Sequence, residues 1–322
     1  MTQGPFLNVA VHASVHPAAL AAELRDGVAS GTVATRQLYI SVRQARLWRA
    51  IAAAFSPARD DGDGGRAYER VNVHAATLLA GEPVHVIGLG CGDGAKERRL
   101  LDSLTQHGPL TATPVDVSLP LVLTAADLLG ASAQLGRPVV CDLGLAASDL
   151  PTMVESAGGR RIVTLYGILP GLDAAPALAA AGALLRPGDL LAVSANLLPP
   201  DTGALERVTA QYDNAPTRRW LGALLDEAGI DAARCALRIE ALEDPGAGAY
   251  AGVGAWLDPL EPFTAELEAG PVDLHPDCPV RVLRSARHTP TGLAAIVEAT
   301  GLHVLAVEVS PSGEEGVLLA IR

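Results

Sequence analysis

Residues 84–101 read VHVIGLGCGDGAKERRLL, and this stretch decides the fold class. β-favouring residues run into Gly90, Gly92 and Gly94, and a charged helical pattern begins at Lys96. Glycines lack a Cβ atom, so the backbone can approach a ligand closely, and the start of a helix offers free N–H groups. The stretch therefore predicts a strand, a loop that binds a nucleotide or nucleoside, and a helix. A tight turn without a ligand has the same pattern, and the Gly-Lys-Ser/Thr of a P-loop is absent.

Strands and helices alternate after this stretch. Apolar strands are expected at residues 84–89, 110–117, 138–143, 161–169, 189–195, 304–309 and 316–321, and helices at 96–107, 120–135, 176–185 and 291–300. This order predicts an α/β fold with a mostly parallel sheet covered on both faces. Helical patterns also cover 17–29, 37–55, 68–79 and 200–230, a strand is expected at 279–285, and the signals at 238–268 are mixed. The Asp- and Gly-rich segment 56–67 is expected to be a loop and a domain boundary.

Composition limits the function classes. The chain has 322 residues, a net charge of −12, a pI of about 5.1 and 49% hydrophobic residues, which indicates a globular protein. An acidic chain without Lys/Arg runs is a poor binder of nucleic acid or anionic membranes. Separated cysteines, no signal-peptide pattern and no long apolar run predict a protein of the reducing cytoplasm. His275, Asp277 and Cys278 have metal-ligand chemistry but no second cluster, so a loop is expected there and no metal site is predicted.

Two aspartates follow the next two strands. Asp116 closes the second strand, where it can accept two hydrogen bonds from ribose hydroxyls. Asp142 closes the third strand, where it can accept a hydrogen bond from the exocyclic amine of adenine while Leu143 covers the ring. Either aspartate alone is more often a helix cap or a turn residue. Because the glycine loop and both aspartates stand at successive strand ends, we expect a nucleoside in the cleft above the sheet.

These motifs carry a resemblance. The glycine loop, DVS at 116–118, Asp142 and the helix–PGD–strand unit resemble a class I S-adenosylmethionine-dependent methyltransferase. Over nearly its whole length the chain resembles the histidine Nα-methyltransferase family of ergothioneine biosynthesis, through QLYISVRQARLW, AYERVNVHAATLL, VTAQYDNAPTRRW and VRVLRSARHTPTGLAAIVEATGL. The resemblance implies a Rossmann-like methyltransferase domain, at 66–199 and 286–322, and a smaller α+β substrate-recognition domain, at 1–65 and 200–285. It implies S-adenosylmethionine as the cofactor and a substrate that binds between the two domains.

Three residues depart from the pattern of that family. Gly88 replaces an acidic residue that helps to hold the amino end of the cofactor, which puts S-adenosylmethionine in question. Leu172 stands where the family has an Asn, and Leu283 stands where it has a Glu, although both of those polar groups bind the amino-acid substrate. A site that hydrogen-bonds a polar substrate rejects other molecules by orders of magnitude. Histidine is therefore not the expected substrate.

Other residues match the family and carry expected roles. Tyr39, Tyr212 and Asp213 are the expected catalytic residues: a tyrosine hydroxyl would orient an amine, and Asp213 or water would take its proton. Tyr68 falls near a second substrate-binding tyrosine. The alternative for each tyrosine is a half-buried core residue whose hydroxyl has a partner.

The strand at 279–285 adds a cationic face. If side chains alternate along it, Arg281, Ser285 and Arg287 share one face with Leu283. The arginine guanidinium suits carboxylate, sulfate or phosphate. These residues are therefore expected to bind an anionic substrate, although a solvated edge strand would have the same pattern.

Three functional hypotheses follow. The leading one is N-methylation of a small, amino-acid-like metabolite that can be anionic, in secondary metabolism. The alternative is an enzyme of this fold that no longer methylates, in which an amine displaces sulfate or phosphate within one molecule and closes a ring such as an aziridine. The third is a non-catalytic, methyltransferase-like subunit. A small molecule is the expected partner, and both a monomer and a complex with a small protein fit the sequence.

Overall fold

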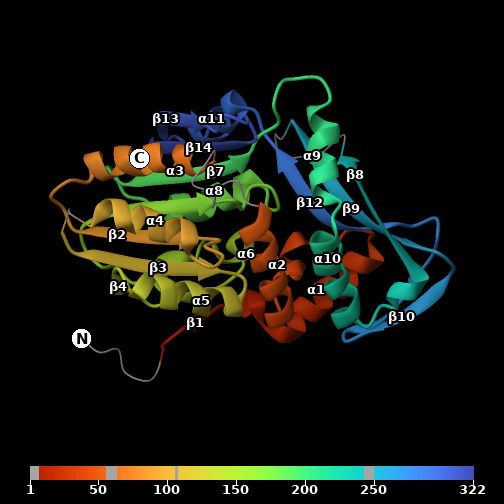
Figure 1. Ribbon diagram of the computed structural model, residues 1–322. Helices are drawn as coiled ribbons and strands as arrows, with labels where there is room; N and C mark the ends of the chain where they lie inside the picture. The colour runs from red at the N-terminus through yellow and green to blue at the C-terminus, as the bar shows by residue number, and fades with distance from the viewer. Residues whose placement is uncertain (1–6, 56–63, 106–107, 243–249) are drawn as a thin grey trace.

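The large sheet has nine strands (Figure 1). The computed structural model describes residues 7–55, 64–105, 108–242 and 250–322. Eight strands follow the order β1-β5-β3-β2-β6-β7-β14-β13, and β4 pairs with β3. The bounds are β1 Ala10–Val11, β2 Val84–Leu89, β3 Leu110–Asp116, β4 Gln134–Leu135, β5 Val139–Val140, β6 Arg160–Tyr166, β7 Leu190–Asn196, β13 His303–Val309 and β14 Glu315–Ile321.

Strand direction identifies the fold. All pairings from β1 to β7 are parallel, whereas β14 is antiparallel to both β7 and β13. A mostly parallel sheet with one reversed strand near its C-terminal edge is the sheet of a Rossmann-like methyltransferase fold, as the sequence predicts. In such sheets, ligands bind at the carboxyl ends of the strands.

Helices cover both faces of this sheet because the strand side chains alternate. Val86, Leu190 and Ala192 pack on one side against α3 Gly64–Leu78, α4 Ala95–Leu104 and α5 Leu119–Gly130. Ile87, Leu191 and Val193 pack on the other side against α6 Leu143–Ala146, α7 Leu150–Met153, α8 Ala174–Leu184 and α11 Pro290–Glu298. The result is the two-faced core that the apolar strands predict.

A smaller α+β lobe stands beside the carboxyl ends of these strands (Figure 1). Its sheet has the order β12-β9-β8, and β10 and β11 form a hairpin. The strands are β8 Cys235–Leu242, β9 Ala251–Pro259, β10 Phe263–Leu267, β11 Gly270–Leu274 and β12 Val280–Arg287. The helices are α1 Pro17–Ala29, α2 Val42–Phe55, α9 Ala204–Tyr212 and α10 Ala215–Ala228, with 3-10 turns η1 Ala13–Val15, η2 Thr35–Leu38 and η4 Ala232–Arg234. One hydrophobic cluster around Leu38, Trp220, Leu257 and Leu283 joins these elements.

Several boundaries differ from the sequence prediction for local reasons. The third strand is only two residues long, because the Asp142 side chain caps α6 immediately afterwards. The fourth strand ends at Tyr166, because Gly167 has a φ of 78° and turns the chain. The expected helix 120–135 ends at Gly130, and β4 then rejoins the sheet. Of the expected loop 56–67, residues 56–63 lie outside the described ranges, and α3 already begins at Gly64.

Two features of the described residues bear on function classes. None of the described helices has both the length and the apolar character that a membrane crossing needs. Within the same ranges, no three His, Cys, Asp or Glu side chains come together as metal ligands would.

Candidate active site between the two lobes

A cavity of about 590 Å³ opens where the carboxyl ends of the large sheet meet the small lobe. Its volume is within the roughly 300–1,000 Å³ that is usual for small-molecule sites. In Figure 1, α2 and α10 lie between the large sheet and the small sheet. The cavity wall includes Arg36, Tyr39, Trp48, Gly90, Gly92, Asp93, Lys96, Asp116, Asp142, Leu143, Ile168, Asn196, Tyr212, Trp220, Arg281, Leu283, Arg284, Ser285 and Glu315.

The glycine loop has the backbone that the sequence predicts. Gly90, Gly92 and Gly94 have φ values of 65°, 56° and 78°, which side chains other than glycine rarely adopt. Their missing Cβ atoms, however, make room for the protein's own groups. A Cβ on Gly92 would lie 2.7 Å from Cη2 of Trp48, and one on Gly90 would overlap Ile168. Side chains of α2 and of the loop after β6 thus stand over the part of the loop that a cofactor would approach.

Asp116 lies in the cavity wall at the end of β3, but its carboxylate already has partners. Oδ2 accepts a hydrogen bond from the Gly92 backbone N–H (2.9 Å), and Oδ1 accepts one from that of Ser118 (2.9 Å). Burial raises the pKa of Asp116, and these backbone bonds lower it in part. The aspartate holds the glycine loop in place, and each oxygen still has a lone pair for a ribose hydroxyl.

The sequence predicts that Asp142 binds the adenine amine, but in the structure its carboxylate contacts protein groups. Its Oδ1 accepts from the Leu145 backbone N–H (2.9 Å) and caps α6, while Oδ2 lies 3.0 Å from Nη1 of Arg36. Arg36 also donates to Glu23 of α1. The Arg36 guanidinium therefore ties the end of β5 to the small lobe at the point where adenine was expected.

A second carboxylate occupies the space beside Gly88. A Cβ on Gly88 would lie 3.0 Å from Cγ of Glu97, which comes from α4. Glu97 is 1% exposed, and Thr164 Oγ1 donates to its Oε1 (2.8 Å), whereas Oε2 has no hydrogen-bond partner among the described residues. Burial raises the pKa of Glu97 to about 7. β2 lacks the family's acidic residue at Gly88, and the carboxylate of Glu97 lies beside that position instead. Glu97 is buried and does not line the cavity.

A hydrogen-bonded group lies at the other end of the cavity. The Tyr212 hydroxyl and Ser285 Oγ are 2.6 Å apart, and Asn196 Nδ2 lies 3.4 Å from each. Tyr39 packs against Trp220 with ring centroids 5.4 Å apart. Burial raises the pKa of the Tyr39 hydroxyl, and the charge of Asp116 raises it further. Tyr39 lines the same cavity as the glycine loop and Tyr212.

Four expected site residues do not line this cavity. The first is Gly94, the N-cap residue of α4. Tyr68 is 1% exposed; its hydroxyl donates to Glu315 Oε1 (2.5 Å) and is also hydrogen-bonded to Ser194 Oγ (2.6 Å). Asp213 is exposed, and its carboxylate accepts from Arg218 Nε (2.6 Å), which lowers its pKa. The structure therefore does not bring Tyr68 or Asp213 to the position of a reacting amine.

The fourth is Arg287, which is buried and contacts Tyr212. Its guanidinium carbon lies 5.8 Å from the centre of the Tyr212 ring, and Nη1 donates to the Leu197 carbonyl (3.1 Å). Its Nε has no partner among the described residues. The side chain supports Tyr212 from below and is not exposed to the cavity.

The prediction that Arg281, Ser285 and Arg287 share one face of β12 is wrong. Arg281 pairs with Trp256 and Leu283 pairs with Ala255, so β12 advances two residues against one of β9. This bulge reverses the alternation. Arg281 consequently shares a face with Arg284, while Leu283, Ser285 and Arg287 share the other one.

The two cavity-lining arginines differ in their partners. Arg284 donates to Asp173 Oδ1 (2.5 Å). The Arg281 guanidinium has no hydrogen bond or ion pair with any described residue, and it lines the cavity. Arg281 is therefore a cation that is available to an anionic ligand.

Arg36, Trp48, Lys96 and Glu315 are among the residues of the wall that sequence reasoning missed. Arg36 and Trp48 flank or belong to the quoted QLYISVRQARLW, but only the fold shows which strand ends they meet. Lys96 is the second residue of α4, directly after the glycine loop. Glu315 is the first residue of β14, one residue before the predicted start of the strand, and because β14 is antiparallel to β7 it lies opposite Asn196 at the carboxyl end of β7.

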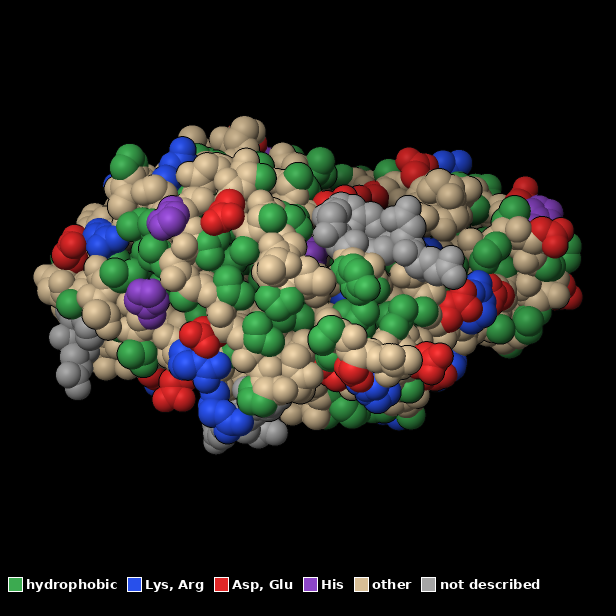
Figure 2. All heavy atoms as spheres, turned by 90° about the horizontal axis from the view of Figure 1, so that it is seen from above, with side chains coloured by type: hydrophobic (Ala, Val, Ile, Leu, Met, Phe, Trp, Pro, Cys, Tyr) green, Lys and Arg blue, Asp and Glu red, His purple; other side chains and the backbone are tan. Residues whose placement is uncertain are grey.

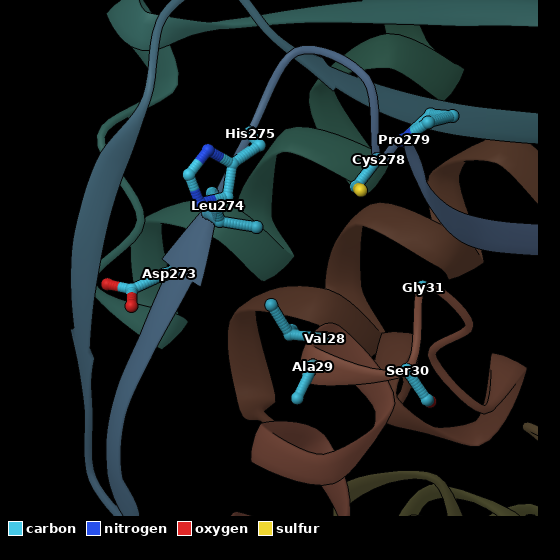
Figure 3. Close-up of a pocket in the computed structure, with 9 residues that line it drawn as sticks. All are labelled: Val28, Ala29, Ser30, Gly31, Asp273, Leu274, His275, Cys278 and Pro279. Carbon is cyan, nitrogen blue, oxygen red and sulfur yellow. The ribbon is translucent and has the colours of Figure 1, made fainter.

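A second cavity, of about 340 Å³, lies in the small lobe between α1 and the loop after β11 (Figure 3). It contains the predicted loop around His275 and Cys278. In Figure 3 the Asp273 carboxylate points to the side opposite Cys278, and Thr264 donates to it (2.6 Å). These groups do not converge on one point.

The surface adds no basic patch on the face seen from above. Figure 2 shows that acidic and basic side chains alternate there in small groups. That face has no continuous cationic surface of the kind that binds nucleic acid.

Comparisons with known proteins find distant solved structures only. No protein-family model and no curated protein matches the chain. An O-methyltransferase family 2 protein from Planctomyces limnophilus, solved with apigenin, is 14% identical over 86% of this chain and 61% of its own length, with a TM-score of 0.43. A SAM-dependent methyltransferase from Aquifex aeolicus is 12% identical over 85% and 97%, with a TM-score of 0.42.

A third similar structure is a possible exported protein from Bordetella parapertussis, which is 13% identical over 96% of this chain and 98% of its own length, with a TM-score of 0.49. All three scores are below 0.5. The fold assignment therefore rests on the strand order and strand directions given above.

Proposed function

We propose that this protein is an enzyme of the cytoplasm that transfers the methyl group of S-adenosylmethionine to the amine of a small, amino-acid-like metabolite other than histidine. The observation that supports it is that one cavity contains both the glycine loop with Asp116 and the Tyr212–Ser285–Asn196 group. Tyr39 lines the same cavity. The sequence resemblance to histidine Nα-methyltransferases motivates the amino-acid-like substrate.

The residues present fit the cofactor in part. Asp116 retains hydrogen-bonding capacity for a ribose, and Leu143 and Leu121 offer apolar surface to a base. When bound, S-adenosylmethionine supplies a methyl group that is already activated on a sulfonium. Tyr212, Ser285 and Asn196 would orient the amine, since their hydroxyl and amide groups form one connected set. Tyr39 and Trp220 would exclude water from the space between.

A specific observation favours a second candidate. Trp48 and Ile168 pack against the glycine loop, and Arg36 forms an ion pair with Asp142. The part of the cavity where a nucleoside would bind is therefore partly filled by the protein's own side chains. The Arg281 guanidinium, which has no partner among the described residues, suits a sulfate or phosphate group. The second candidate is an enzyme without methyl transfer, in which an amine nitrogen forms a bond to carbon as the C–O bond to sulfate or phosphate breaks. The electron pair leaves with the anion, and a small ring closes.

Calorimetry separates the two candidates. The probes are S-adenosylmethionine, S-adenosylhomocysteine and 2-aminoethyl sulfate, each titrated into the wild type and into Asp116→Asn. Methyl transfer predicts that both nucleosides bind and that Asp116→Asn weakens them at least tenfold. Absence of nucleoside binding to the folded wild type refutes methyl transfer.

Arg281 provides the second test. The second candidate predicts that 2-aminoethyl sulfate binds the wild type and that Arg281→Ala weakens it at least tenfold, while the exposed Arg43→Ala has no effect. Arg43 is the matched control because it belongs to α2 and pairs with Asp226 on the surface. Equal affinities of the wild type, Arg281→Ala and Arg43→Ala for 2-aminoethyl sulfate would show that Arg281 does not form an anion site. If none of the probes binds, the result favours the third hypothesis, a non-catalytic subunit.

A further inference from the structure

Glu315 has the geometry of a proton acceptor. It begins β14 at the floor of the cavity and is 4% exposed. In the sheet it pairs directly with Asn196 of β7. Asn196 in turn contacts Tyr212 and Ser285. The carboxylate therefore lies beside the group that is proposed to orient the amine.

The other carboxylates of the cavity wall are held for structural purposes. Asp116 accepts from two backbone N–H groups, Asp142 caps α6 and pairs with Arg36, and Asp173 pairs with Arg284. Asp93 lies 3.6 Å from Nε of Arg49, at the other end of the cavity. Glu315 is distinguished by its position next to Asn196.

The surroundings of Glu315 favour a carboxylate that can change its charge. Burial raises its pKa, and the charges of Lys96 from α4 and Arg287 from β12 lower it in part. The Tyr68 hydroxyl of α3 donates to Oε1 (2.5 Å), and Ser194 of β7 also stabilises the ionised form. Tyr68 is thus a positioning residue that fixes the direction of the carboxylate, which explains why a buried tyrosine stands at this point.

We propose that Glu315 binds the substrate's ammonium group and takes its proton. The inference rests on the proposed function, because both candidates there need a neutral amine. A primary amine is an ammonium ion near neutral pH and has no lone pair for attack. One N–H bond breaks, the proton goes to a Glu315 oxygen, and the lone pair stays on nitrogen. That pair then forms the new bond to carbon, and the leaving group departs with the electrons of the bond that breaks.

Binding of a simple ammonium ion tests this step without turnover. The probe is propylammonium chloride, with sodium chloride at equal ionic strength and propan-1-ol as references, and the measurement is Tm. The expected result is a saturable rise in Tm for the wild type with propylammonium alone, which is lost in Glu315→Gln. Glutamine retains an oxygen that can accept from Tyr68, so this variant keeps the buried hydrogen bond.

Glu314→Gln is the matched control. Glu314 precedes Glu315, is only half-buried and contacts Gln211 (3.2 Å), so its substitution removes the same charge outside the buried network. This variant should show the wild-type rise. No saturable rise in the wild type, or equal rises in the wild type and Glu315→Gln, overturns the proposal. Nucleoside calorimetry on the wild type is independent of this result, so a failure of methyl transfer and a failure of the Glu315 assignment are distinguishable.

Discussion

Replacement of Glu97 by glutamine should remove a large part of the pH dependence of stability. Glu97 is buried beside Gly88, and its pKa is raised from 4.5 to about 7 by burial. The folded state therefore keeps this proton up to about pH 7, whereas the unfolded chain releases it near pH 4.5. Between these values the folded state binds more protons, so the free energy of unfolding falls as the pH rises.

The size of the effect follows from the shift. One pKa unit corresponds to about 1.4 kcal/mol, so the shift of Glu97 corresponds to a loss of about 3 kcal/mol between pH 4.5 and pH 8. Glutamine can still accept from Thr164, while its amide nitrogen falls at the Oε2 position, which has no partner among the described residues. That defect shifts the stability of the variant by an amount that does not change with pH.

Urea unfolding at pH 5, 6, 7 and 8 measures the difference between Glu97→Gln and the wild type. We expect this difference to change by about 3 kcal/mol in favour of the variant across the series. Glu206→Gln, which removes an exposed carboxylate from α9, should keep the wild-type decline. A difference between Glu97→Gln and the wild type that stays constant from pH 5 to pH 8 would refute the reasoning.

Three further predictions concern the loop, a buried histidine and the tie between the lobes. Gly92→Ala should destabilise by about 1–3 kcal/mol in urea unfolding, because φ is 56° and Trp48 lies 2.7 Å from the added Cβ, and Trp48→Leu should reduce that cost. A cost below about 0.5 kcal/mol would contradict the contact. Burial lowers the pKa of His85 to about 4, so the unfolded chain takes up this proton at a higher pH than the folded protein does. The free energy of unfolding therefore decreases as the pH falls from 6.5 to 4. His85→Gln should lose less of that free energy than the wild type does between pH 7 and pH 4.5. Arg36→Gln should strengthen S-adenosylhomocysteine binding in calorimetry by freeing Asp142, and weaker binding would show that Arg36 supports the nucleoside.

The fold could be predicted because its signals are local and repeated. The strand 84–89 and the helix 17–29 agree with β2 and α1 at both ends, since apolar periodicity and flanking Gly or Pro residues define them. The third strand was predicted too long, because the capping bond of Asp142 is a tertiary feature of the turn. The domain boundaries stay a prediction.

The site could be predicted only in part. The positions of Gly92 and Asp116 at strand ends predict that they lie close together, and both line the cavity. The fold brings Tyr39, Tyr212 and Ser285 to the same cavity. Sequence could not reveal the bulge that turns Arg281 away from Ser285, because a single extra residue leaves the apolar pattern intact. It also could not reveal which side chains cover the glycines, because Trp48 comes from a helix 40 residues away in sequence.

The contact of Arg36 with Asp142 and Glu23 has a thermodynamic consequence. A ligand that takes the Asp142 oxygen now paired with Arg36 detaches a cation that also holds α1, so binding of that ligand and loosening of this contact with the small lobe are one coupled equilibrium. The measured association constant for such a ligand equals its intrinsic constant multiplied by the fraction of molecules in which the guanidinium is already detached. A ligand that does not use this oxygen avoids the penalty and leaves Arg36 bound to α1.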